Sequence, residues 1–233
     1  MDLSSAPPSI AVCPARRWDE NEAMMGSDGR KSIRVDLQLI ADMIESGSRV
    51  LDVGCGNGTL LDYLVHFKQV DGRGIELGTE GVNVCVSAGL SVIQGDAEID
   101  LKDYPDQAFD YVVLSQTLQA MHAPKEVLLN LMRIGRKAIV SFPNFAHWRL
   151  RLYLGFRGQM PLGDALSYDW FDTPNIHLCT IKDFIVLCEE QGISIERSIA
   201  LDHNGTMRRI GSSAFTANLF GEQAVFLLTA NPA

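Results

Sequence analysis

The chain has 233 residues, a net charge of −9 and a pI near 5.0, and 46% of its residues are hydrophobic. This length suits one α/β domain with a sizeable core, and the acidic balance argues against a nucleic-acid backbone as the main partner. Five cysteines without a CxxC pair argue against a disulfide framework or a zinc module, and no apolar run reaches the length of a membrane span. We therefore expect a cytoplasmic protein with a small-molecule or protein partner.

Residues 1–29 are rich in Ser, Pro and Gly and lack the apolar segment of a signal peptide. We expect a flexible N-terminal arm there, followed by a single domain at residues 30–233. The domain begins with an amphipathic pattern from Arg30 to Ser46, in which Ile33, Leu37 and Ile40 share one face. This pattern predicts the first helix.

The next segment, RVLDVGCGNGTLL from Arg49 to Leu61, predicts a strand, a glycine-rich turn and a helix. Glycine allows the backbone to approach a ligand closely, and the helix that follows presents unpaired N–H groups. The glycines are spaced G-x-G-x-G, unlike the G-x-G-x-x-G of dinucleotide sites. Asp52 precedes the first of them by two residues and favours a ligand with a positive end. A tight turn without a ligand is the alternative that this motif leaves open.

Two further strands end in acids. The strand Asp71–Glu76 ends about twenty residues after the turn, where nucleotide-binding folds place the carboxylate that accepts hydrogen bonds from ribose. The segment Ser91–Ala97 predicts another strand, with Asp96 at its end. Together with Asp52, three successive strands carry an acid near their carboxyl ends, which predicts one shared site.

The remaining elements continue the alternation of strand and helix. They are a helix at Gly78–Ala88, a strand at Phe109–Leu114, a helix from Pro124, a strand at Lys137–Ser141, a helix at Ile181–Gln191 capped by Thr180, and strands at Ser194–Leu201 and Ala224–Ala230. This order predicts an α/β fold with a doubly wound, mostly parallel sheet. The connection Phe142–Cys179 is far longer than an ordinary one, so we expect an insertion after the fifth strand that carries specificity.

The strings LDVGCGNG, GIE, QGDAE and FDYVVLSQTL resemble those of class I S-adenosylmethionine (AdoMet)-dependent methyltransferases. This resemblance implies a Rossmann-like sheet of seven strands with the last one antiparallel, and AdoMet or S-adenosylhomocysteine as ligand. It also implies that the glycine turn holds the methionine part, Glu76 the ribose and Asp96 the adenine amino group. The candidate cofactor-binding residues are Asp52, Gly54, Cys55, Gly56, Gly58, Glu76, Leu77, Asp96, Ala97, Ser115 and Gln116. We expect Cys55 to pack in the turn and not to act as a nucleophile.

Longer strings, VVLSQTLQAM, IVSFPNFAHWRLRL and YDWFDTPNIHLCTIKDF, closely resemble the methionine biosynthesis protein MetW family. The resemblance implies work alongside homoserine O-acyltransferase, without a defined methyl acceptor. Two positions depart from the wider methyltransferase pattern. Gly78 stands where many relatives have an acid after the ribose-binding residue, and Asn57 stands in the glycine turn where an acid is common.

The sequence assigns no catalytic residue. Methyl transfer from AdoMet needs alignment and exclusion of water more than acid–base groups. His122, His147 and His177 are the histidines near the predicted site, and we expect structural hydrogen-bonding roles for them. His177 and Cys179 alone offer too few ligands for a metal site.

The insertion combines arginines with Trp148, Tyr168, Trp170 and Phe171. These aromatic residues are suited to packing against the sheet edge, to forming a lid, or to contacting a protein partner. Two functions follow. The first is an AdoMet-binding accessory subunit that supports homoserine O-acyltransferase. The alternative is a free-standing AdoMet-dependent methyltransferase of small molecules.

Overall fold

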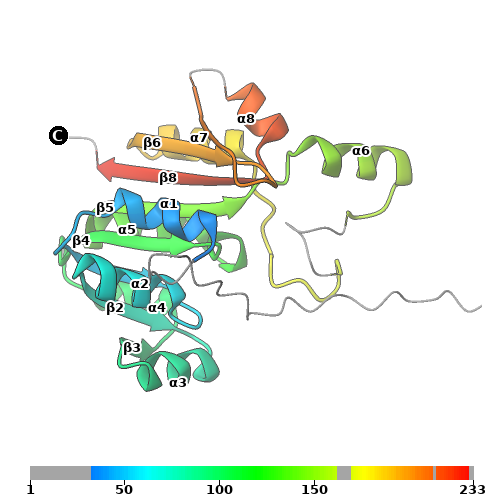
Figure 1. The fold of residues 1–233 in the computed structure, drawn as a ribbon. Coiled ribbons are helices and arrows are strands. Elements are labelled where there is room, and N and C mark those ends of the chain that lie inside the picture. Colours follow the sequence, from blue (N-terminus) through cyan, green and yellow to red (C-terminus); the bar gives the residue numbers. More distant parts are fainter. Residues whose placement is uncertain (1–32, 162–168, 212–213, 231–233) are drawn as a thin grey trace, which may run out of the picture. The chain divides into compact units, whose positions relative to one another are not determined.

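The computed structural model describes residues 33–161, 169–211 and 214–230, which belong to one compact unit that begins at Ile33. Its strands are β1 (Arg49–Val53), β2 (Asp71–Glu76), β3 (Ser91–Gln94), β4 (Phe109–Ser115), β5 (Gly135–Pro143), β6 (Ile193–Leu201), β7 (Met207–Arg209) and β8 (Gln223–Ala230). They form one sheet in the order β3-β2-β1-β4-β5-β8-β6-β7 (Figure 1). The predicted N-terminal arm lies outside the described residues.

The first five strands of the sheet are parallel, and β8 runs antiparallel to both of its neighbours, β5 and β6. The predicted α/β class, the mostly parallel sheet and the antiparallel last strand are thereby confirmed. The expected number of seven strands is wrong, because the three residues of β7 pair with the end of β6 as an eighth strand. All three side chains of β7 are exposed, so no apolar alternation marks it in the sequence.

Helices cover both faces of this sheet. They are α1 (Val35–Met43), α2 (Thr59–Lys68), α3 (Thr79–Ser87), α4 (Ala97–Asp100), α5 (Pro124–Ile134), α6 (Trp148–Arg157), α7 (Ile181–Glu190) and α8 (Phe215–Phe220), with short 3₁₀ turns η1 (Leu101–Asp103) and η2 (Leu118–Ala120). Alternate residues of β4 belong to different cores: Val112 and Leu114 pack with α5 and α7, whereas Tyr111 and Val113 pack with α1 and α2. Burial on both faces explains the continuous apolar run of residues 111–114 within β4.

The first helix is shorter than the predicted Arg30–Ser46. It ends at Met43 because Ile44 turns into extended backbone, and the Lys68 ammonium donates to the carbonyls of Ala41 and Ile44. This lysine satisfies carbonyls that the helix end leaves without intrahelical partners.

Two other predicted helix starts are confirmed. Pro124 occupies the first turn of α5, and the Thr180 hydroxyl accepts a hydrogen bond from the Asp183 N–H at the start of α7. Proline has no N–H to leave unsatisfied at that position, and the threonine satisfies one of the donors that α7 leaves open. No described helix is long and apolar enough to cross a membrane.

Candidate functional site: a glycine turn beside two strand-end carboxylates

Three glycines form the turn between β1 and α2. Gly54, Gly56 and Gly58 have φ values of 69°, 56° and 77°, in the left-handed region that favours glycine. A Cβ on Gly54 would lie 2.9 Å from the Thr117 hydroxyl, and one on Gly58 would lie 2.7 Å from the Cys85 sulfur. A Cβ on Gly56 would meet no described atom within 4 Å. Packing therefore requires two of the glycines, and Gly56 lies on the open side of the turn, where a ligand can approach.

Glu76, the last residue of β2, lies directly against this turn. Its Oε2 accepts a hydrogen bond of 2.8 Å from the Gly56 N–H, and its Oε1 accepts one of 2.8 Å from the Gly78 N–H. Each carboxylate oxygen has a second lone pair, so both can still accept from hydroxyl groups of a ligand. Two backbone donors thus orient a carboxylate that is suited to holding a diol.

Asp96 follows β3 at the same edge of the sheet, since β3, β2 and β1 are adjacent and parallel. Its Oδ1 accepts a hydrogen bond of 2.9 Å from the Glu98 N–H, which makes Asp96 the N-cap of α4. The Gly95 N–H donates to the Glu76 carbonyl, which joins the ends of β2 and β3. The predicted gathering of acids at one edge is thus observed.

Asp52 is buried on β1 and is only 2% exposed. Burial raises the pKa of its carboxyl group to about 7, and the nearby negative charge of Glu76 adds to this effect. A positive charge brought to the turn would favour the ionised form of Asp52. The electrostatics of the turn therefore favour a ligand with a cationic group.

Four further residues that the sequence predicts to contact the cofactor lie at different positions along this edge of the sheet. Ser115 is the last residue of β4 and Gln116 follows it. The Ser115 hydroxyl lies 3.2 Å from the Ser141 hydroxyl, and the Gln116 N–H donates to the Ser141 carbonyl at 3.0 Å. Gln116 has a φ of 55°, which is uncommon for a residue with a side chain. Leu77 is 67% exposed beside Glu76, whereas Ala97 is partly buried against the core. Of these four, Leu77 presents the most accessible surface to a ligand.

Cys55 packs in a small apolar cluster with Leu61, Cys85 and Leu90. Burial raises the pKa of its thiol well above the ordinary value, and the charge of Asp52 adds to the shift. A thiol held neutral in this way is a poor nucleophile. The structure therefore gives Cys55 a packing position, as expected.

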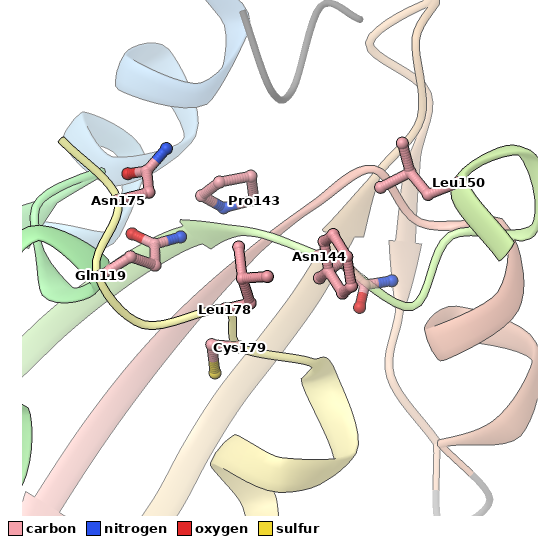
Figure 2. Close-up of a pocket in the computed structure, with 8 residues that line it drawn as sticks. Gln119, Pro143, Asn144, Leu150, Asn175, Leu178 and Cys179 are labelled. Carbon is pink, nitrogen blue, oxygen red and sulfur yellow. The ribbon is translucent and has the colours of Figure 1, made fainter. Parts of the chain in front are cut away.

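The edge beyond β4 and β5 is occupied by the end of the insertion. The N–H groups of Ile176 and His177 donate to the Gln119 carbonyl at 2.8 and 2.9 Å, and the Phe145 N–H donates to the Cys179 carbonyl at 3.0 Å. Figure 2 shows Gln119, Asn175 and Leu178 gathered beside Pro143, at the end of β5. These bonds hold the insertion across the carboxyl ends of the two strands.

The cavity left at this edge has a volume of about 10 Å³, which suffices for about one water molecule. The Gln119 side chain lines it and is 3% exposed, and neither its amide oxygen nor its amide nitrogen has a hydrogen-bond partner among the described residues. A buried amide without partners is costly, so one bound water suits the cavity. A methyl acceptor larger than water does not fit it.

A model of the family "Methionine biosynthesis protein MetW" matches residues 34–228. The chain belongs to the MetW family. The bifunctional methionine biosynthesis protein MetXA/MetW of Rhodopirellula baltica is 35% identical over 180 residues, covering 73% of this chain and 29% of that protein. The fatty-acid O-methyltransferase of Mycolicibacterium smegmatis is 39% identical over 89 residues, covering 36% of this chain and 32% of that enzyme. The chain thus spans about a third of the length of these curated relatives.

Solved structures with the same fold include AdoMet-dependent methyltransferases. The enzyme from Mesorhizobium loti has a TM-score of 0.61 at 14% identity, covering 84% of this chain and 97% of that one. A possible histamine N-methyltransferase from Thermotoga maritima has a TM-score of 0.59 at 16% identity, covering 84% of this chain and 87% of that one. At such identities the likeness shows the fold alone, which is that of class I methyltransferases.

The structure explains both departures of this MetW family member from the methyltransferase pattern. Gly78 donates its N–H to Glu76, and a Cβ there would lie 3.2 Å from that carboxylate, so the acidic side chain of other relatives would crowd it. The Asn57 Oδ1 accepts hydrogen bonds from the Thr59 N–H at 3.2 Å and the Thr59 hydroxyl at 2.6 Å. Asn57 therefore stabilises the first turn of α2.

The three candidate histidines have different surroundings. The His122 ring is exposed and lies 3.0 Å from the Glu98 carboxylate, and the His177 ring contacts the His122 carbonyl at 3.3 Å. His147 is buried, and this burial lowers the pKa of its imidazole, with Arg149 adding to the effect. Within the described ranges, no group of three His, Cys, Asp or Glu residues could hold a metal ion.

Two aromatic residues of the insertion, Trp170 and Phe171, do not pack against the sheet edge. Trp170 and Phe171 are 74% and 71% exposed and contact each other edge to face, with ring centroids 5.7 Å apart. Helix α6 has no buried residue, and its Phe156 is 86% exposed. Tyr168 lies outside the described residues. The interpretation of these aromatics as packing residues is therefore wrong for Trp170 and Phe171.

The sequence did not single out Gln119 or Asn144. Asn144 is fully buried, and its amide donates to the carbonyls of Asn218 and Gly221 while its oxygen accepts from the Ile181 N–H. It thereby fixes the start of the insertion to the segment before β8. Both residues lie within strings that resemble MetW, but polar side chains give no sequence signal for burial.

Proposed function

We propose that this MetW family member binds AdoMet or S-adenosylhomocysteine at the glycine turn and serves as an accessory subunit of homoserine O-acyltransferase in methionine biosynthesis. The observation that carries the proposal is the insertion. Its end is hydrogen-bonded across the carboxyl ends of β4 and β5, and its Phe156, Trp170 and Phe171 side chains are exposed. A surface of this kind is suited to a protein partner more than to a small acceptor.

The R. baltica relative supports the choice of partner. Its name assigns a MetXA part and a MetW part to one protein. The resemblance to the MetW family implies work alongside homoserine O-acyltransferase. We take the MetXA part to be this acyltransferase. Domains that are fused in one protein often correspond to separate chains that form a complex in other organisms. We therefore expect a separate MetW chain to bind a separate homoserine O-acyltransferase.

The cofactor role has its own geometric support. Gly56 leaves open space on the turn, Glu76 is oriented beside it, and the raised pKa of Asp52 favours a cationic ligand such as the sulfonium of AdoMet. Calorimetry with AdoMet and S-adenosylhomocysteine tests this role. Micromolar binding, about −8 kcal/mol, is expected for the parent protein, and the side chain of Gly56→Val should obstruct it. No binding of either ligand at millimolar concentration would refute the cofactor role.

The partner role is tested by co-expressing the chain with the homoserine O-acyltransferase of its own organism. The proposal expects a complex, and acylation that depends on it. Phe156→Ser and Trp170→Ser should each weaken the complex by tenfold or more, because buried aromatic residues dominate interfaces. Val86→Ser is the matched control, since Val86 is 56% exposed but lies on α3, outside the insertion.

A free-standing methyltransferase is the second candidate, and the open glycine turn favours it. It requires space for a methyl acceptor beside the turn, and the cavity at the ends of β4 and β5 is too small to provide it. If the acyltransferase neither binds this chain nor gains activity or stability from it, the accessory role is wrong. Methylation of a defined metabolite by the isolated chain would then establish the alternative.

A further inference from the structure

A second cavity, separate from the glycine turn, lies between the start of α6, the turn after β6, and β7. Its volume is about 300 Å³, and it is lined by basic, acidic and aromatic side chains. This volume is at the lower end of the range for small-molecule sites. We propose that it binds a free α-amino acid with an apolar side chain.

Two arginines supply the carboxylate-binding end. Arg149 and Arg208 both line the cavity, and neither forms an ion pair with any residue that the structure describes. Arg149 lies in the first turn of α6, where there is no acid and no side-chain cap. A cation at this end opposes the helix dipole, so a bound anion stabilises both the arginine and the first N–H groups of the helix.

The opposite charge comes from Asp202. Its Oδ1 accepts hydrogen bonds from the N–H groups of Asn204 and Thr206, at 3.0 and 2.9 Å. The Thr206 N–H contributes most to lowering the pKa of Asp202, so the side chain stays ionised at neutral pH. A cavity with unpaired arginines and one fixed carboxylate matches a zwitterion better than a simple anion, since the ammonium group of an amino acid is suited to Asp202.

A buried histidine adds a polar contact. The His147 side chain is 8% exposed and lines the cavity, and its ring makes no hydrogen bond to a described residue. Its Nε2 lies 4.0 Å from the Glu222 carboxylate, which is beyond hydrogen-bonding distance. The imidazole therefore lines the cavity as a polar group with Glu222 as its charged neighbour, and its ring nitrogens can hydrogen-bond to a ligand.

Aromatic side chains provide the apolar wall. Trp148 and Phe220 line the cavity and are 37% and 47% exposed. Arg149 stacks on Trp148, with its guanidinium carbon 5.5 Å from the ring centroid, so the charged and apolar parts of the site adjoin. A ligand that covers these rings buries apolar surface, so an amino acid with an aliphatic or thioether side chain is favoured over one with a polar side chain.

L-Methionine is a suitable probe, since it is an apolar α-amino acid. Binding to the parent protein is measured by calorimetry and by saturation-transfer NMR. Two analogues delete one charge each: methioninol lacks the carboxylate, and 4-(methylthio)butanoate lacks the amino group. Each should bind about tenfold more weakly or worse, the cost of losing a hydrogen bond to a charged group.

Substitutions of residues that line the cavity test whether L-methionine binds there. Arg149→Gln and Asp202→Asn should each weaken L-methionine binding about tenfold. Asparagine keeps the oxygen that holds the turn, so Asp202→Asn removes the charge without unfolding it. Arg157→Gln on the same helix is the matched control, because Arg157 stacks on Tyr153 and does not line the cavity.

Three results would overturn the inference. The first is no L-methionine binding at about 10 mM. The second is binding that Arg149→Gln and Asp202→Asn leave at the level of Arg157→Gln. The third is binding that Gly56→Val abolishes, because the amino acid would then occupy the glycine turn. Failure of AdoMet binding alone leaves the inference standing, since the two sites share no residue.

Discussion

The Asp52→Asn substitution removes a carboxyl group that is 2% exposed and whose pKa rises from 3.8 to about 7 in the folded protein. The folded state holds this proton more tightly than the unfolded chain does. The contribution of this group to the free energy of unfolding is therefore fully present below about pH 3.8 and is lost as the pH rises to about 7.

The size of the effect follows from the shift. About three pKa units at about 1.4 kcal/mol each give about 4 kcal/mol in all, of which about 1 kcal/mol is already lost at pH 4.5. Between about pH 4.5 and pH 8, the parent should therefore lose about 3 kcal/mol more stability than Asp52→Asn, in which this titration is absent. All other titrating groups are common to both proteins and cancel in the comparison.

Urea unfolding of both proteins at the two pH values, followed by circular dichroism, measures this difference. Equal pH dependence in parent and variant, within about 0.5 kcal/mol, would refute the reasoning about the buried carboxyl. The same group also reports the proposed ligand. A sulfonium beside the turn lowers the pKa of Asp52, so AdoMet binding near pH 6.5 should release a proton, measurable by calorimetry in two buffers of different ionisation enthalpy.

Three further predictions concern single contacts. Glu76→Gln should weaken AdoMet binding tenfold or more in calorimetry, because an amide nitrogen cannot accept from Gly78 or from a ribose hydroxyl; unchanged affinity would show that the site is misplaced. Gly58→Ala should lower stability in urea unfolding by about 1–3 kcal/mol more than Gly89→Ala, since both have φ near 77° but only Gly58 is crowded; equal losses would contradict this packing argument. Thr180→Ala should cost about 1 kcal/mol in the same assay through loss of the α7 cap, and no loss would show the cap to be inert.

The sequence predicts the parts of the fold that depend on local pattern. The strand–turn–helix at Gly54, the acids at successive strand ends and the cap at Thr180 all follow from spacing, because parallel strands bring their carboxyl ends to one edge. The short strand β7 does not, since its three exposed residues carry no alternation. Its pairing depends on the turn that Asp202 holds.

The environment of the site is less accessible to sequence reasoning. The position of Glu76 beside the turn follows from its place on β2, but its two backbone donors come from segments about twenty residues apart. The burial of Gln119 depends on where the insertion folds back, and nothing local encodes that. Likewise, the spacing of Trp170 and Phe171 is compatible with a buried or an exposed face.

The hydrogen bonds from Ile176 and His177 to the Gln119 carbonyl join the insertion to the loop that follows Ser115 and Gln116. A partner that displaces this segment also frees the loop after β4, beside the proposed ligand-binding edge. Thermodynamic reciprocity then requires that a ligand which stiffens the loop change the affinity for the partner by the same factor. A methyltransferase fold connected in this way can report the level of a methyl donor to another enzyme without transferring the methyl group.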